Sequence, residues 1–222
     1  MIRLSASSIS DFIKCSKMFE FRATRSEDSI NTEEQAIGNF AHKVIEENIH
    51  YTMNDPLIDI LLIEYNIQDT EKALRYLENF TLLRPGLIIR EDDQKEFYFR
   101  EKIGADLQLS GKMDRVNTVD HIVYDWKAST STKKYLSNDV QMIIYYQMYH
   151  RIFGNYPSVF LVNLHHKDIR PFYPNKRYID TLFNRVIPKI MQEVEHKQFY
   201  KTGYFTSSCF RCPYIGVCHS EE

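Results

Sequence analysis

The stretch that decides the fold reads Gly111-Lys-Met-Asp114-Arg-Val116, followed by Ile122-Val-Tyr-Asp125-Trp-Lys127. Both halves are rich in β-branched and aromatic residues, which predicts two neighbouring strands. Residues two apart on a strand share a face, so Asp125 and Lys127 project together while Trp126 points to the other side. An acid and a lysine are therefore expected side by side on one strand.

The spacing also predicts how the two strands pair. With the turn centred between Val119 and Asp120, Asp114 is expected directly opposite Asp125. Cross-strand partners lie roughly 5 Å apart at Cβ, and two carboxylates that close repel unless a cation lies between them. Mg²⁺ or Mn²⁺ is the natural occupant. Lys127 beside it could orient or deprotonate a water and steady the charge on a phosphate.

An ordinary charged surface hairpin is the alternative interpretation of these residues. The same strands carry Val116, Ile122, Val123 and Trp126, which favours a partly buried sheet instead.

Working outward from the hairpin, hydrophobic periodicity predicts a mixed α/β domain with a central sheet flanked by helices. Strands are expected over 96–102, 107–116, 121–128 and 158–164. Helices are expected over 33–48, 57–83, 138–153 and 178–199. A further N-terminal helix, opened by a capping box at Ser8-x-x-Asp11, is expected to contain Cys15.

Length and composition favour a single domain over residues 1–222, because 43% hydrophobic residues suffice for a well-filled core. The apolar runs are too short for a membrane span, and the N-terminus lacks the apolar core of a signal peptide. We therefore expect a soluble cytoplasmic protein with no membrane partner.

The charge is unevenly spread along the chain. The net charge of −2 argues against a passive coat for nucleic acid. Residues 27–78 carry twelve acids against three Lys or Arg, whereas residues 170–201 carry seven Lys or Arg against three acids. The basic stretch is a candidate DNA-facing surface, with a solvated helix face as the alternative.

Four cysteines suggest one four-thiolate centre. Cys209, Cys212 and Cys218 are closely spaced, and Cys15 is the one thiol left to complete the set. Disulfides and buried thiols are alternatives. Zinc also accepts four thiolates, but usually through two paired C-x-x-C knuckles. A centre joining the two ends of the chain is expected to be structural.

Three further residues are candidates for the site on their spacing. His42 lies one helical turn after Gly38, where an imidazole could complete a Mn²⁺ shell. Gln141 and Tyr145 share one helix face. Taken alone, each of the three could be an ordinary packed or surface residue.

Together, these motifs resemble the RecB-like PD-(D/E)XK nucleases that carry an iron–sulfur staple. They occur in order over residues 5–218: Ser7-Ser8-Ile9-x-x-Phe12-x-x-Cys15, Gly38-x-x-x-His42, Gly111-x-x-Asp114-Arg-Val, Asp125-x-Lys127, Gln141-x-x-x-Tyr145 and Cys209-x-x-Cys212-x5-Cys218. The family includes the AddB nuclease domain, CRISPR adaptation exonucleases and stand-alone phage nucleases. The resemblance implies a restriction-endonuclease-like core.

The resemblance also implies roles for individual residues. It implies a 4Fe–4S cluster on the four cysteines, and metal binding by His42, Asp114, Asp125 and the Trp126 carbonyl. It implies that Lys127 is catalytic, that Gln141 and Tyr145 form the final motif near the DNA, and, more distantly, that Glu96 is an extra acid. Asp114 follows Met rather than the Pro of the family name.

The function expected on this basis is metal-dependent DNA hydrolysis. The expected activity is that of an exonuclease on single-stranded ends in recombination, repair or phage DNA metabolism. Tyr145, Tyr146 and Tyr149 could stack on bases or lie in the core. The alternatives are a subunit of a CRISPR spacer-acquisition complex that docks through 27–78, and a non-enzymatic, zinc-stapled DNA-binding module. No Gly-x4-Gly-Lys-Ser/Thr loop is present, so unwinding would need a helicase or recombination partner.

Overall fold

The structure is a computed structural model that describes residues 2–24, 32–130, 136–201, 209 and 212–220. Within these ranges, one mixed sheet contains β1 (Ile2–Leu4), β2 (Gln94–Lys102), β3 (Leu107–Asn117), β4 (Ile122–Lys127), β5 (Ser158–Asn163) and β6 (Asp168–Pro171). The helices are α1 (Ala6–Lys14), α2 (Ser16–Thr24), α3 (Glu33–Glu47), α4 (Pro56–Glu64), α5 (Thr70–Leu83), α6 (Val140–Phe153), α7 (Lys176–Thr181), α8 (Ile187–His196) and α10 (Ile215–Ser220). Two single turns complete the set, the 3₁₀ turn η1 (Arg84–Gly86) and the π turn η2 (Leu182–Val186).

The longest strand, β3, divides the sheet. β2 pairs antiparallel along almost the whole length of β3 and so occupies one of its sides. The other side is shared, because β1 pairs in parallel with Leu107–Leu109 and β4 pairs antiparallel with Arg115–Asn117. In the described part of the chain, residues 110–114 have no strand partner on that side. The sheet is therefore open beside the middle of β3.

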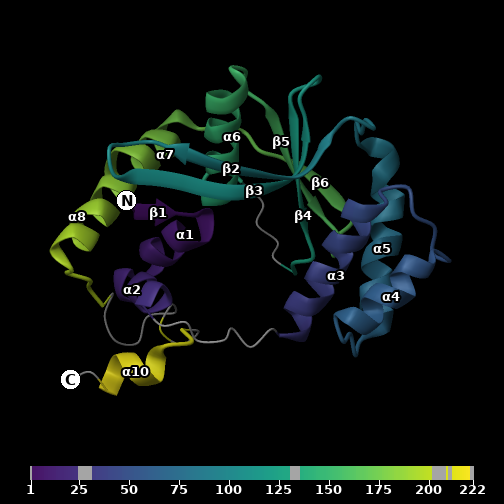
Figure 1. The fold of residues 1–222 in the computed structure, drawn as a ribbon, viewed down its shortest axis with the longest axis horizontal. Coiled ribbons are helices and arrows are strands. Elements are labelled where there is room, and N and C mark those ends of the chain that lie inside the picture. Colours follow the sequence, from purple (N-terminus) through teal and green to yellow (C-terminus); the bar gives the residue numbers. More distant parts are fainter. Residues whose placement is uncertain (1, 25–31, 131–135, 202–208, 210–211, 221–222) are drawn as a thin grey trace.

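Helices cover both faces of the sheet, as β4 shows most clearly. Val123 packs in a core built with α1, α6 and α8. Its neighbours Tyr124 and Trp126 pack in a second core built with α3, α4 and α5. Figure 1 shows α1 and α2 at one end of the sheet and α3, α4 and α5 at the other. A strand buried on both faces is apolar almost throughout, which is how residues 122–126 read in the sequence.

The N-terminal helix begins earlier than predicted and stops before Cys15. The capping box is formed by Ser5 and Ser8, so Ser8 is the third helical residue rather than the cap. Asp11, the expected partner of Ser8, is buried and pairs with Arg22 of α2. Cys15 is extended, with φ −166° and ψ 120°, and separates α1 from α2. The prediction that Cys15 lies inside a helix was therefore wrong.

One predicted helix is divided in the structure, and another is continuous but contains a π turn. Residues 57–83 form α4 and α5, because Asn66 turns the chain with φ 50° and Asp69 caps the second helix. Residues 178–199 form α7, η2 and α8. Pro188 cannot donate a backbone hydrogen bond near the start of α8, and such a residue favours an irregular turn before it. The short strands β1 and β6 were not predicted.

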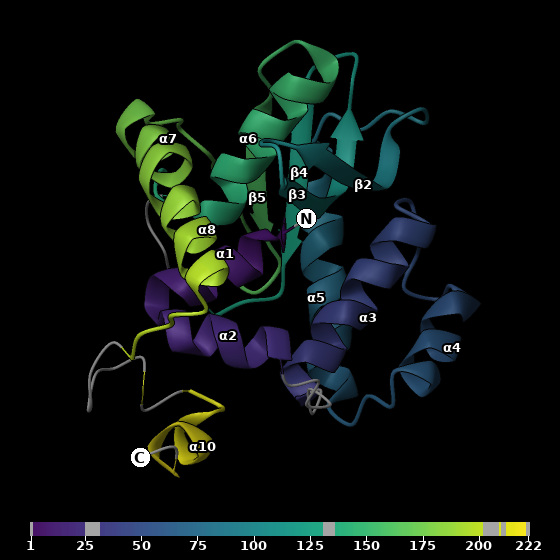
Figure 2. The ribbon, with the colours of Figure 1, turned by 60° about the vertical axis from the view of Figure 1, so that its left-hand side comes forward.

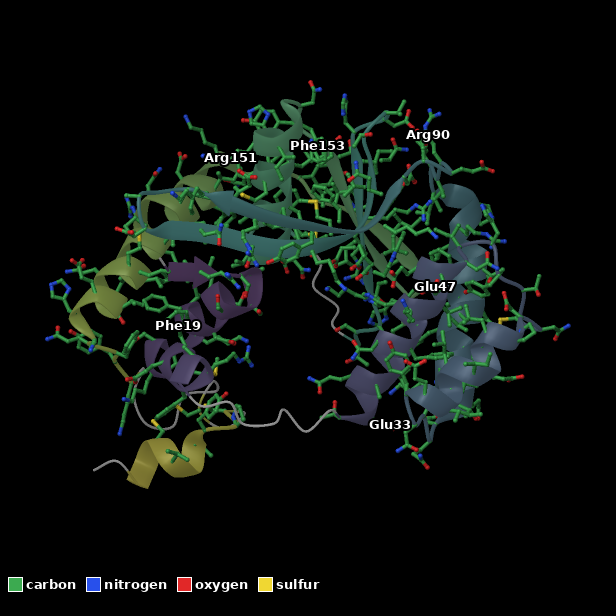
Figure 3. All side chains as sticks on the ribbon, viewed as in Figure 1. Phe19, Glu33, Glu47, Arg90, Arg151 and Phe153 are labelled. Atoms are coloured by element: carbon green, nitrogen blue, oxygen red, sulfur yellow. The ribbon has the colours of Figure 1, made fainter. Side chains whose placement is uncertain are left out.

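The segment after α8 returns to the N-terminal helices. Phe19 of α2 packs edge-on against Phe12 of α1, with ring centroids 5.8 Å apart, and against Phe199 at 6.1 Å; its position is labelled in Figure 3. The Tyr200 N–H donates to Ser16 Oγ at 2.7 Å. Figure 2 shows α8 leading towards α2, with α10 beyond it. Chain segments from both ends of the sequence therefore lie together.

The pair formed by Phe99 and Gly111 provides a test of the β2–β3 packing. The two residues are register partners, and a Cβ at position 111 would lie 2.6 Å from the Phe99 ring. We expect Gly111→Ala to destabilise the protein by about 1–3 kcal/mol, because a well-packed core does not accept the extra methyl group. Urea unfolding measures the effect. In a Phe99→Leu background the same substitution should cost less; an equal cost in both backgrounds would contradict this packing.

Candidate active site

The β3–β4 hairpin has the predicted register. Arg115 pairs with Tyr124, and Val116 pairs with Val123. The ladder ends at Arg115, and one step further along the same register places Asp114 opposite Asp125. The Asp114 side chain reaches across, because its Oδ2 accepts a hydrogen bond from the Trp126 N–H at 2.7 Å. The two carboxylates therefore meet where β3 and β4 separate.

Asp125 is fully buried and held from two directions. Its Oδ1 accepts a hydrogen bond from Gln141 Nε2 of α6 at 2.9 Å. Lys127 Nζ lies 3.1 Å from its Oδ2 and 3.3 Å from its Oδ1. Yet Oδ2 is buried without a hydrogen bond of good geometry. A buried oxygen in that state normally has a further partner, and a cation would supply one.

Burial controls the protonation of both carboxyl groups. It raises the pKa of Asp114 to about 6, although the positive charge of Lys127 and the Trp126 hydrogen bond act in the opposite direction. It also raises the pKa of Asp125 to about 6; Lys127 again opposes the shift, and repulsion from Asp114 adds to it. Near neutral pH, binding of a cation would therefore release protons from the two carboxyl groups.

Lys127 keeps its charge in this setting. Burial alone would lower its pKa, but attraction by Asp125 and Asp114 outweighs burial, and the pKa lies above its ordinary value. A permanently charged ammonium can stabilise a phosphate, whereas it cannot take up a proton from water. Of the two roles predicted for Lys127, the structure favours stabilisation of charge.

His42 of α3 completes one side of the site. Its Nδ1 lies 3.6 Å from Asp114 Oδ2, and 27% of its side chain is exposed. Burial and the nearby charge of Lys127 lower the pKa of His42 to about 4, against the attraction of Asp125 and a hydrogen bond with the Trp126 backbone. The imidazole is therefore neutral at pH 7 and has a lone pair for a metal. The Trp126 backbone faces the site, while its indole ring packs against Phe80 with centroids 5.4 Å apart.

Gln141 and Tyr145 lie together on α6, as their spacing predicted. Gln141 Nε2 lies 2.6 Å from the Tyr145 hydroxyl, which in turn donates a hydrogen bond to the Lys112 carbonyl of β3. Burial raises the pKa of Tyr145 well above its usual range, so this hydroxyl stays protonated. The two side chains link α6 to Asp125 and to β3, which makes them positioning residues.

Of the two alternatives for the α6 tyrosines, stacking on bases or lying in the core, two of the three residues lie in the core. Tyr145 is 3% exposed and Tyr149 is fully buried. Tyr146 is partly buried and stacks on Tyr156 with centroids 4.8 Å apart. Tyrosines at helical spacing are compatible with either core or surface, and the sequence pattern alone did not separate the two.

Glu96 and Lys112 form a pair that the sequence reading only partly anticipated. Glu96 has φ 50°, and its neighbours pair on either side of Asp114, so it occupies the register position beside that residue. Its carboxylate contacts the Lys112 ammonium. Lys112 was given no role, although its position two residues before Asp114 in the hairpin strand was a usable signal.

Two clefts meet at Lys127. The first, about 660 Å³ in volume, lies between α1, the middle of β3 and the start of α6. It uses the opening that the division of the sheet leaves beside β3. The second, about 340 Å³, lies between α3 and the segment after β4, and includes His42, Gly38 and Ser129. Figure 1 shows α1 and α3 on opposite sides of the β3–β4 pair.

The basic stretch 170–201 borders a hollow that adjoins the first cleft at Ile13 but is separate from it. None of its described residues lines either of the two clefts at Lys127. Lys189 and Lys201 instead border the hollow, which lies between α1 and α8. The stretch does not join the catalytic residues, and its role as the DNA-facing surface loses support.

The cysteine segments also come together. Cys15, Cys212 and Cys218 pack around Met18, Phe21 and Tyr214. Burial raises the pKa of the Cys212 thiol, and the neighbouring Cys15, Cys218 and Cys209 add to the shift. Within the described ranges, however, no three His, Cys, Asp or Glu side chains are arranged closely enough to hold a metal ion. This applies both to the cysteines and to the carboxylate site.

The comparison with known families follows from this arrangement of strands and acids. The sequence matches the model of the PD-(D/E)XK nuclease superfamily over residues 3–219. The chain belongs to the PD-(D/E)XK nuclease superfamily. The narrower resemblance to members with an iron–sulfur staple stays a prediction. No curated protein matches the sequence.

One solved structure has a similar fold. A candidate exonuclease from Eubacterium rectale is similar with a TM-score of 0.58 and 14% identity, covering 94% of this chain and 87% of that one. At this identity the likeness concerns the fold alone. The structure of SSO0001 was also found, with a TM-score of 0.41 at 15% identity over 96% and 97% of the two chains. None of the helices in the described ranges has the length and apolar character needed to cross a bilayer.

The buried pair makes a prediction about the metal-free nuclease. Because the pKa of Asp114 rises from 3.8 to about 6 on folding, the folded state binds more protons between these values, and stability is lost as the pH rises through them. Above pH 6, Asp114→Asn should therefore be more stable than the parent protein by about 3 kcal/mol in urea unfolding with EDTA. Below about pH 4 the two proteins should be equally stable.

Added Mn²⁺ should reverse this order. A ligand that binds only the folded state raises its stability, so the parent protein should gain thermal stability and Asp114→Asn should gain little. Equal stabilisation of both proteins would contradict a metal site at Asp114.

Proposed function

We propose that this nuclease hydrolyses DNA phosphodiester bonds with Mg²⁺ or Mn²⁺ and acts as an exonuclease on single-stranded ends. The observation that carries the proposal is the buried Asp114–Asp125 pair with Lys127 at the junction of two clefts. Membership of the superfamily supports nuclease chemistry. The charged lysine and the clefts support a phosphate-bearing substrate.

The donor set fits a hard divalent ion. Asp114 and Asp125 would hold it, with the neutral imidazole of His42 and the Trp126 carbonyl as further ligands. Mg²⁺ usually takes one or two carboxylates and completes its shell with water and phosphate oxygens, so a three-residue cage is not required. When bound, the ion would polarise the phosphate and lower the pKa of the attacking water.

The residues of the chain itself bind and orient the substrate. Lys127 stabilises the negative charge that builds up on the phosphate oxygens in the transition state. Gln141 fixes the Asp125 carboxylate by its hydrogen bond at 2.9 Å, and Tyr145 fixes Gln141. The helix therefore sets the direction in which the carboxylate presents its free oxygen.

Catalysis can be tested by single-turnover cleavage of end-labelled single- and double-stranded DNA with Mn²⁺ or Mg²⁺. Asp114→Ala should abolish cleavage, because a site with one of its two carboxylates removed no longer places the ion. Lys127→Ala should lower the rate at least a hundredfold while retaining metal binding, since it removes only charge stabilisation.

Lys176→Ala is a matched control, because it also removes one lysine but lies on the exposed surface of α7. It should cleave at the parent rate. Parent-like rates from both Asp114→Ala and Lys127→Ala would refute the proposed active site. Cleavage of duplex ends at the same rate as single strands would refute the substrate preference.

We also propose a structural 4Fe–4S cluster on Cys15, Cys209, Cys212 and Cys218. The proximity of the four thiols and the return of the C-terminal segment to α2 support it. The cluster would link Cys15 to cysteines near the other end of the sequence and so lower the conformational entropy of the unfolded chain.

Iron analysis tests the cluster. Anaerobically purified protein should contain about four iron atoms per chain and be brown, as cubane clusters with four thiolates are. Cys212→Ser should lose both the colour and thermal stability. Stoichiometric zinc without iron would instead indicate a zinc staple.

A further inference from the structure

The first cleft has a positive lining in a chain whose net charge is −2. Lys14, Lys112 and Lys127 line it against one acid, Asp139. Lys14 and Lys112 are 57% and 55% exposed at their side chains, so both ammonium groups can reach a ligand in the cleft. The three lysines come from α1, β3 and β4, and the fold alone brings them together.

Neighbouring carboxylates do not cancel this charge. Asp11 lies 3.5 Å from Lys14 but is itself buried and also paired with Arg22. Glu96 contacts Lys112 from the β2 side and does not line the cleft. Both pairs are exposed at their lysine end, where solvent weakens the attraction, so a phosphate can compete for both lysines.

The remaining lining suits a nucleotide strand. Ser7 and Ser10 of α1 border the cleft and can donate hydroxyl hydrogen bonds to phosphate oxygens. Ile13, which is 51% exposed, adds apolar surface for a base. Cations and hydroxyl groups together with an exposed apolar side chain match a strand that has both phosphates and bases.

The second cleft has a different character. Lys127 is the one lysine or arginine in its described lining, and Glu34 opposes it. At about 340 Å³ it is also the smaller of the two. Among the described residues, a phosphate backbone that leaves the catalytic centre therefore has three lysines in the first cleft and Lys127 alone in the second.

We infer that the DNA strand being cleaved lies in the cleft between α1, β3 and α6, with its phosphates on Lys14 and Lys112. This inference rests on the proposed nuclease function and adds where the strand is bound. The cleft volume of about 660 Å³ is in the range of pockets that hold one small ligand, roughly 300–1,000 Å³. It has room for a short piece of one strand, and a single strand is the occupant that the inference names.

Salt-dependent binding tests the strand path. Fluorescence anisotropy of a labelled oligothymidylate, with EDTA to prevent cleavage, gives Kd at several salt concentrations for the full chain. Lys14→Gln and Lys112→Gln should each reduce the slope of log Kd against log salt by about 0.7, because each removes one phosphate contact on a single strand. Lys176→Gln removes a lysine outside the cleft and should leave the slope unchanged.

A steric variant provides an independent readout. Ser7 is exposed, so Ser7→Trp should fold normally and yet fill the cleft; it should raise Kd at least tenfold, while Ser7→Ala should not. Unchanged slopes for both lysine variants together with unchanged binding by Ser7→Trp would overturn the inference. Equal affinity for a duplex of the same length would overturn its single-strand part.

The outcomes separate the strand path from the proposed function. If the parent protein binds with the expected slopes but does not cleave with Mn²⁺ or Mg²⁺, the proposed function fails and the strand path stands. If the parent protein cleaves while the cleft variants bind and cleave like it, the strand path fails and the function stands.

Discussion

The burial of two neighbouring carboxylates is the constraint that the rest of this structure has to accommodate. Asp114 and Asp125 come together because the hairpin register leaves them no other place. Two ionised acids in a low dielectric separate if the backbone allows it. Here β4 is clamped between two hydrophobic cores, so the strain is relieved by protonation or by a cation rather than by movement of the strand.

The groups around the pair follow from this constraint. Lys127 supplies the nearest positive charge. The two acids in turn raise the pKa of its ammonium group. Gln141 satisfies one oxygen of Asp125 and leaves the other without a hydrogen bond. The division of β3 then determines access, because the edge of β3 that no strand occupies becomes the floor of the larger cleft. Asp114 of the candidate active site and the residues that line the cleft therefore lie next to each other on β3.

Local pattern was sufficient to predict the hairpin of the candidate active site. Alternation and a short turn fix the register of residues 114 and 125, and helical spacing places Gln141 beside Tyr145. The remainder depended on tertiary context. The three residues of β1 have no periodicity to detect. The extended conformation of Cys15 and the π turn before Pro188 arise where helices must change direction to pack. The burial of Tyr149 and the distance of 170–201 from the site depend on how helices dock, which sequence spacing does not encode.

The pairing of β1 with β3 also has a kinetic consequence. Ile2 is the register partner of Leu107, so this contact closes a loop of about a hundred residues, whereas β2, β3 and β4 follow one another directly. Local pairings form early in folding, and distant ones wait for the chain entropy of loop closure to be overcome. The acids should therefore meet before α1 docks beside them. In the folded protein the same order applies in reverse: partial opening at the N-terminus removes the wall of the cleft first and leaves the hairpin intact.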